Sequence, residues 1–164
     1  MLKFADLFTI LNLVCAFISI IFSIKNDFFL ASIFLLLCVL FDFLDGKIAR
    51  FMKSENKFGK ELDSLSDIVA FGITPVIFGF CIGLDNILLI SSLIFFLICS
   101  QLRLARFNIL NIKGYVGMPV TLNGIIFPLL YFTLFNTIYF INILFFIYFI
   151  LGILMISDIK FKKI

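Results

Sequence analysis

The sequence has no histidine and no tryptophan among its 164 residues, and only 14% of it is charged. Soluble domains carry about 25% charged residues. Without histidine, the protein has no imidazole to serve as a general base near neutral pH, as a nucleophile or as a metal ligand. Any acid–base or metal chemistry must therefore depend on other side chains, and the low charge content argues against a soluble globular protein.

Cysteine is also scarce, with four residues and no closely spaced pair such as Cys-x-x-Cys. Zinc sites and redox-active disulfides usually show such short spacings. The thiols are therefore predicted to be small buried hydrophobic side chains rather than disulfide partners or zinc ligands: Cys15, Cys38, Cys81 and Cys99.

Long apolar runs make up most of the chain, which is 63% hydrophobic with a mean hydropathy of +1.25. A helix that crosses a bilayer needs roughly 20 apolar residues, so six spans leave only short connections and no room for a separate soluble domain. We expect an all-α polytopic membrane protein that forms one domain over residues 1–164 and has no cleavable signal peptide. The expected spans lie near residues 5–24, 28–50, 61–84, 87–108, 118–137 and 140–158.

Basic residues are distributed unevenly between the two sides of these six spans. With the N-terminus in the cytoplasm, Lys25 is the single basic residue on the outside, and the other twelve of the 13 Lys and Arg residues are on the inside. Cationic flanks stay on the cytoplasmic side of a membrane. Both termini are therefore predicted to be cytoplasmic, in a protein of the cell membrane.

The acidic residues are concentrated in residues 42–67, which hold six of the ten Asp and Glu residues. Asp42 and Asp45 fall on one face at the cytoplasmic end of the second span, and Asp63 and Asp67 form a stripe at the cytoplasmic start of the third. Two antiparallel helices joined by a short loop can turn these stripes toward each other. The four carboxylates are therefore predicted to share one pocket just inside the inner leaflet.

Such a cluster needs positive charge or protons, because like charges repel and burial near lipid costs about 3 kcal/mol per charge. Carboxylate oxygens without histidine or thiolate suit hard divalent ions, so the cluster predicts Mg²⁺ or Mn²⁺, with two ions to balance four carboxylates. A single Asp at a helix end is more often a cap or a surface group. The spacing of all four on two facing stripes favours the metal site.

Small and basic residues lie beside the carboxylates. Gly46, Ala49 and Gly59 would allow a flat base or a pyrophosphate to approach the backbone, and Arg50 offers donors to anionic oxygens. The two glycines are also typical of helix packing in membranes. Together with the carboxylates, this set favours a site for a nucleotide-activated phosphate ester of a membrane lipid.

The pattern D-x-x-D-G-x-x-A-R from residue 42, followed after eight residues by G-x-x-x-D-x-x-x-D from residue 59, resembles the signature of the CDP-alcohol phosphatidyltransferases. Further likeness, to the phosphatidylserine synthase branch, lies in residues 59–75, 102–109, 114–124 and 154–161. The resemblance implies a six-helix homodimer that transfers a phosphatidyl group from a CDP-linked lipid to an alcohol and releases CMP.

The resemblance also implies roles for individual residues. Asp42, Asp45 and Asp63 match the family's aspartates that bind metal around the CDP pyrophosphate. Asp67 matches the aspartate assigned as the catalytic base, which can also contact a metal. Contacts with the CDP-lipid are implied for Gly46, Ala49, Arg50 and Gly59, and contacts with the nucleotide for Thr9 and Asn12.

The acceptor is not determined by this signature. Arg103, Arg106 and Asn108 lie at the cytoplasmic end of the fourth span, where the arginines are either positive-inside anchors or ligands of an acceptor carboxylate. Together with the resemblance to the phosphatidylserine synthase branch, the two arginines favour CDP-diacylglycerol and L-serine as substrates. No nucleic acid is expected as a partner. The alternatives are glycerol 3-phosphate or an inositol phosphate as acceptor, an archaeal CDP-ether lipid as donor, or, in another class, a cation-coupled transporter with intramembrane carboxylates.

Overall fold

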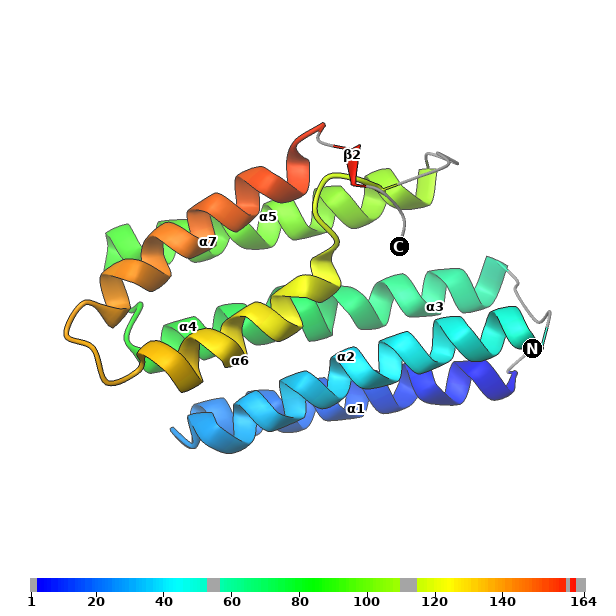
Figure 1. Cartoon of the computed structure of the whole chain (residues 1–164), viewed down its shortest axis with the longest axis horizontal. Helices are drawn as coiled ribbons and strands as arrows, with labels where there is room; N and C mark the ends of the chain where they lie inside the picture. The colour runs from blue at the N-terminus through cyan, green and yellow to red at the C-terminus, as the bar shows by residue number, and fades with distance from the viewer. Residues whose placement is uncertain (1–2, 53–56, 110–114, 159, 162–164) are drawn as a thin grey trace.

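The computed structural model describes residues 3–52, 57–109, 115–158 and 160–161. Over these residues the chain forms an elongated bundle of helices (Figure 1). Four helices are long and apolar enough to cross a membrane, namely Asp6–Ile24, Phe28–Phe51, Lys57–Ile82 and Ile87–Ile109, and two shorter apolar helices cover Val120–Leu134 and Phe140–Ile156. The prediction of an all-α protein with six apolar helical segments is confirmed.

The elements in chain order are α1 (Phe4–Ile24), α2 (Phe28–Phe51), α3 (Lys57–Asp67), the π-helix η1 (Ile68–Ile73), α4 (Thr74–Ile82), α5 (Ile87–Ile109), β1 (Tyr115–Val116), the 3₁₀ turn η2 (Val120–Leu122), α6 (Asn123–Leu134), α7 (Phe140–Ile156) and β2 (Lys160–Phe161). The three segments α3, η1 and α4 follow one another without a break and form one long helix. The two short strands pair in antiparallel register, with Tyr115 opposite Phe161.

The third helix begins at Lys57, earlier than the predicted start at residue 61. Its first turn carries Lys57 and Lys60, and α3 is strongly amphipathic rather than uniformly apolar. A search for an apolar run therefore misses this turn, although the backbone continues the same helix. The extension matters for the site because it includes Gly59 in the helix that carries Asp63 and Asp67.

A tight turn sets α1 and α2 antiparallel and side by side (Figure 1). Asn26 adopts a left-handed backbone conformation with φ 61°, which asparagine tolerates better than most residues. The Asp27 side chain then accepts a hydrogen bond from the Leu30 backbone N–H at 3.1 Å and caps α2. The start of α1 consequently meets the end of α2, where the aspartates lie.

One end of the bundle collects most of the charge. Figure 1 places the start of α1, the end of α2, the start of α3 and the end of α5 toward this end, while α7 ends further back along the bundle. We name it the charged end, and the basic residues on these helix ends are Lys47, Arg50, Lys57, Lys60, Arg103 and Arg106. The asymmetry agrees with the predicted topology, and the assignment of this end to the cytoplasm stays a prediction.

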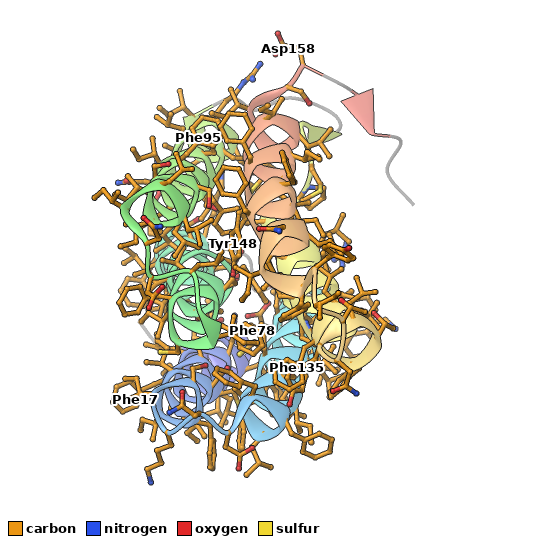
Figure 2. The ribbon with its side chains drawn as sticks, turned by 90° about the vertical axis from the view of Figure 1, so that its left-hand side faces the viewer. Phe17, Phe78, Phe95, Phe135, Tyr148 and Asp158 are labelled. Atoms are coloured by element: carbon orange, nitrogen blue, oxygen red, sulfur yellow. The ribbon has the colours of Figure 1, made fainter. Side chains whose placement is uncertain are left out.

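The centre of the bundle is filled by aromatic and aliphatic side chains. Tyr148 of α7 is fully buried and stacks on Phe127 with ring centroids 4.4 Å apart. Figure 2 shows Tyr148 between the helices and Phe17 at the outer surface, where Phe17 is 61% exposed. Outward-facing phenylalanines of this kind suit contact with lipid. All four cysteines are free thiols; Cys15, Cys38 and Cys99 are buried, as predicted, whereas Cys81 is partly buried.

Candidate active site

Three of the four predicted aspartates converge at the charged end. Asp42 comes from α2, and Asp63 and Asp67 come from successive turns of α3. One carboxylate oxygen of each lies within 4.8 Å of the others. Asp67 is buried, whereas Asp42 and Asp63 are half-buried and remain reachable from outside the bundle. The two stripes therefore face each other, as their spacing predicts.

Asp45, the fourth aspartate, has a partner on another helix. Its Oδ2 accepts a hydrogen bond of 2.8 Å from the Thr9 hydroxyl of α1. The Ser66 hydroxyl of α3 donates in turn to the Thr9 backbone carbonyl at 3.1 Å. Thr9 thus connects three helices and fixes the orientation of the Asp45 side chain, a role that the sequence did not indicate.

The donor set fits a divalent cation. One side-chain oxygen of Asp63 and one of Asp67 are buried without a hydrogen-bond partner among the described residues. Burial of an unpaired carboxylate oxygen is costly, and a cation bound between these oxygens and Asp42 would remove that cost. Oxygen-only ligands of this kind suit Mg²⁺ or Mn²⁺.

The surface of α2 beside the aspartates is open. A Cβ atom added at Gly46 would meet no atom of the described residues within 4 Å. Gly46 is therefore not packed against another helix, which removes the packing explanation for this glycine. Ala49 is half-buried one turn further on, and Arg50 is exposed and donates through Nε to the Gly46 carbonyl at 2.9 Å. Gly59 is half-buried near the start of α3.

Asn12 lies on α1 one turn beyond Thr9 and is fully buried. Both polar atoms of its side chain have no partner among the described residues. Its backbone carbonyl accepts a contact of 3.5 Å from the Cys38 thiol, one turn before Asp42 on α2. Asn12 therefore lies one helical turn of α2 away from the aspartate cluster, and its contact with the nucleotide stays a prediction.

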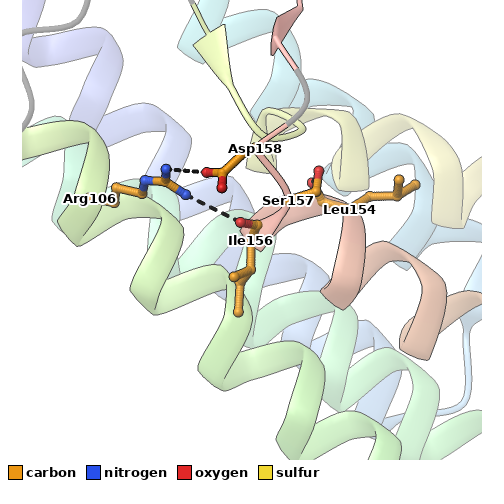
Figure 3. Close-up of polar contacts among 5 residues, drawn as sticks. All are labelled: Arg106, Leu154, Ile156, Ser157 and Asp158. Atoms are coloured by element: carbon orange, nitrogen blue, oxygen red, sulfur yellow. Dashed lines mark hydrogen bonds and ion pairs between the residues drawn. The ribbon is translucent and has the colours of Figure 1, made fainter.

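The two arginines of α5 have different surroundings. Arg103 is 7% exposed, interacts electrostatically with Asp42, and has its guanidinium carbon 5.2 Å from the centre of the Phe107 ring. Arg106 instead contacts the end of α7, donating to the Ile156 carbonyl at 3.2 Å and pairing with Asp158 (Figure 3). Arg103 is therefore buried within electrostatic range of Asp42, whereas Arg106 is directed to the C-terminal segment.

Asn108 connects α5 to α3. Its side-chain amide donates to the Ser64 hydroxyl at 2.9 Å, and the Lys60 ammonium lies 3.3 Å from its backbone carbonyl. Ser64 directly follows Asp63 in the chain, so this contact fixes α5 next to the aspartate stripe. Sequence reasoning missed both Ser64 and Ser66, because neither lies on the stripe formed by the aspartates.

Comparisons with known proteins bear on the same residues. The model of the family described as CDP-alcohol phosphatidyltransferase matches residues 2–160. This chain belongs to the CDP-alcohol phosphatidyltransferase family. It is therefore an enzyme, a transferase of phospholipid biosynthesis, and the transporter alternative is set aside. The family generally depends on divalent metal ions, and the structure has an acidic cluster of Asp42, Asp63 and Asp67.

Several relatives are similar over most of the chain. The CDP-diacylglycerol–serine O-phosphatidyltransferase of Methanocaldococcus jannaschii is 40% identical over 97% of this chain and 73% of its own length. The archaetidylserine synthase of Methanothermobacter thermautotrophicus is 36% identical over 97% of this chain and 69% of its own. The CDP-diacylglycerol–serine O-phosphatidyltransferase of Bacillus subtilis is 33% identical over 76% of this chain and 73% of its own.

Proposed function

We propose that this enzyme transfers the phosphatidyl group of CDP-diacylglycerol to the hydroxyl of L-serine and releases phosphatidylserine and CMP. The observation that carries the proposal is the convergence of Asp42, Asp63 and Asp67 next to the buried Arg103. Such a site offers ligands for the cations that accompany a pyrophosphate and a guanidinium for an acceptor carboxylate. The names of the relatives support the same choice of substrates.

The cation site is proposed to consist of Asp42, Asp45 and Asp63, with Asp67 as a further ligand, and to hold two Mg²⁺ or Mn²⁺ ions. When bound, such ions stabilise negative charge on the pyrophosphate oxygens and on the departing CMP. Thr9 keeps Asp45 directed at this site through its hydrogen bond of 2.8 Å. Loss of Asp42, Asp45 or Asp63 is therefore expected to disturb the binding of the CDP group as a whole.

The CDP group is proposed to lie along the open surface of α2. The space beside Gly46 allows a phosphate or the flat cytosine ring to approach the helix backbone. Ala49 and Gly59 are small residues near the same surface, and the exposed Arg50 is available to bind anionic oxygens at its edge. Asn12 offers an unpaired amide from α1.

Asp67 is the proposed general base. It is buried, it lies beside the other two converging carboxylates, and one of its oxygens has no partner among the described residues. It would accept the proton of the serine hydroxyl while that oxygen attacks the phosphorus atom directly and CMP leaves. The absence of histidine from the chain agrees with a carboxylate in this role.

Arg103 is the proposed ligand of the serine carboxylate, because it is buried and lies within electrostatic range of Asp42. Arg106 and Asn108, predicted from the sequence to bind the acceptor, are proposed to support this site indirectly. Arg106 holds the end of α7, and Asn108 holds Ser64 next to the aspartate stripe. Ethanolamine has a hydroxyl but no carboxylate and is therefore expected to be a poor acceptor.

The deciding experiment measures CMP release by purified protein in lipid nanodiscs. CDP-diacylglycerol is offered with serine, ethanolamine, glycerol 3-phosphate or an inositol phosphate, and a parallel series uses an archaeal CDP-ether lipid, because one relative is named an archaetidylserine synthase. Serine is expected to give the fastest turnover. Faster turnover with a phosphorylated acceptor would overturn the serine assignment. A strong preference for the CDP-ether lipid would make that lipid the donor in place of CDP-diacylglycerol.

The charged end is proposed to face the cytoplasm of a cell membrane, and the homodimer implied by the family resemblance is proposed as the active form. A membrane-impermeant thiol reagent should then label a Lys25→Cys variant in intact cells but a Lys47→Cys variant only after the cells are opened. Chemical crosslinking in nanodiscs tests the dimer. Labelling of Lys47→Cys in intact cells would reverse the topology.

A further inference from the structure

The long third helix changes its winding directly after Asp67. Residues Ile68–Ile73 form the π-helix η1, and Asp67 occupies the position before its first residue. π-helical turns are rare and are frequently found at functional sites. Asp67 is the last residue of the regular helix α3, so the contacts that hold η1 also hold the end of α3 that carries Asp67.

Pro75 accounts for the wider turn. A proline inside a helix has no N–H to donate, and its ring collides with the carbonyl four residues earlier, which here belongs to Phe71. A π-turn before the proline moves that carbonyl away from the ring. Thr74 stabilises the turn, since its backbone N–H and its hydroxyl both donate to the Val69 carbonyl, the hydroxyl at 2.8 Å.

The Phe71 carbonyl receives a donor from another helix. The Asn123 side-chain amide, at the first residue of α6, donates to it at 3.2 Å. The next residue is Gly124, where a Cβ would come within 2.7 Å of the Phe71 ring and 2.5 Å of the Val39 side chain. The glycine is what allows α6 to come close enough for this hydrogen bond.

The other contacts of Asn123 are weaker. Its amide nitrogen lies 3.6 Å from the Met155 sulfur, and its side-chain oxygen has no partner among the described residues. The residue is nevertheless fully buried. A buried asparagine that makes one good hydrogen bond is costly unless that bond has a specific purpose, and here the bond reaches the carbonyl that Pro75 cannot pair.

We infer that Asn123 is a positioning residue for Asp67: its amide replaces the donor missing at Pro75 and holds η1 against α6, which keeps the adjoining end of α3, and Asp67 with it, next to Asp42 of α2. The inference rests on the proposed function in one respect, the use of Asp67 as the base. Asn123 itself is not placed in contact with either substrate.

The first test is an Asn123→Leu variant, which keeps the volume and removes the donor. Loss of a residue that orients an active-site group typically costs about 10–100-fold, and we expect kcat to fall in this range while the KM for CDP-lipid changes less than about threefold. Met155→Leu is the matched control, because it removes the other contact of the amide and should leave kcat within about twofold. Wild-type kcat in Asn123→Leu would overturn the inference.

A double-mutant cycle tests the link to Pro75. Pro75→Ala restores an N–H that can reach the Phe71 carbonyl, so Asn123→Leu should cost much less in that background than in the native one. A second cycle uses Asp67→Asn, in which Asn123→Leu should add little further loss if it acts through Asp67. Full additivity in both cycles would show a general packing role and overturn the inference.

Amide hydrogen exchange of the peptide covering residues 68–76 gives a readout that does not need turnover. Exchange there should rise in Asn123→Leu and fall back when Pro75→Ala is added. If no acceptor releases CMP, the proposed function fails and this exchange pattern still decides whether Asn123 holds η1. If the Leu variant does not fold, Asn123→Ala replaces it in each comparison, and unchanged exchange in that variant contradicts the inference.

Discussion

The two ends of the bundle are held together by different kinds of contact. At the charged end, hydrogen bonds between side chains and neighbouring helices connect Thr9 to Asp45, Ser66 to Thr9 and Ser64 to Asn108. At the opposite end, which we name the aromatic end, rings of α2, α4, α6 and α7 pack together: Phe28, Phe78, Tyr131, Phe135 and Phe140. Figure 2 shows Phe78 and Phe135 in this region.

The difference shows what each end demands of its residues. A hydrogen bond depends on a particular donor and acceptor at a set distance, so a substitution at the charged end removes a specific function. Ring packing depends on volume and shape and tolerates similar apolar side chains. Substitutions at the charged end should therefore reduce catalysis, whereas those at the aromatic end should mainly reduce stability.

The largest effect is expected from loss of the cation ligands. Asp42→Asn and Asp63→Asn keep the shape and remove a charge, so each should lower kcat/KM by about 10³-fold or more, equivalent to several kcal/mol of transition-state stabilisation. Excess chelator should abolish CMP release, and added Mg²⁺ or Mn²⁺ should restore it. Full activity in EDTA would contradict the metal site and, with it, the contrast between the two ends.

Asp67→Asn should have the next largest effect. This variant tests whether Asp67 acts as the general base or as a cation ligand. Loss of a general base typically lowers the rate about 10²–10⁴-fold. Binding of CDP-lipid, measured with a fluorescent analogue, should remain close to that of the native protein, with Asp42→Asn as the comparison. A loss of binding as severe as in Asp42→Asn would make Asp67 chiefly a cation ligand.

The arginines of α5 sharpen the comparison within the charged end. Arg103→Lys keeps the charge but loses the planar fork that binds a carboxylate, so we expect the KM for serine to rise roughly tenfold, the effect of losing one charged hydrogen bond. Arg106→Lys should raise the KM for serine less, because Arg106 contacts Ile156 and Asp158. A larger rise in Arg106→Lys would return the acceptor role to Arg106.

The smallest effect on catalysis is expected at the aromatic end. Phe78 is buried and its ring lies 5.4 Å from that of Phe28 and 6.0 Å from that of Tyr131. Phe78→Leu should cost about 1 kcal/mol of stability through lost ring contacts, seen as a lower melting temperature in detergent, with kcat per folded molecule unchanged. Phe17→Leu on the outer surface is the control. A large loss of kcat in Phe78→Leu would show that the two ends are coupled.

The aspartate stripes were predictable because their information is local. Asp42 and Asp45 share a face of one helix and Asp63 and Asp67 a face of the next, and helical periodicity fixes both arrangements from spacing alone. Arg103 and Arg106 were indistinguishable by the same reasoning, since both lie at the same helix end. Their separation depends on the position of α7, which brings Ile156 and Asp158 to Arg106.

By itself, the sequence determined the number and order of the helices, the concentration of charge at one end and the aspartate spacing, because hydropathy and helical period act along the chain. Only the tertiary structure decided which distant residues orient those aspartates. Thr9 reaches Asp45 across 36 positions and Asn123 reaches Phe71 across 52. Such contacts leave no periodic trace in the sequence, since they depend on the packing of one helix against another and on glycines such as Gly124 that permit it.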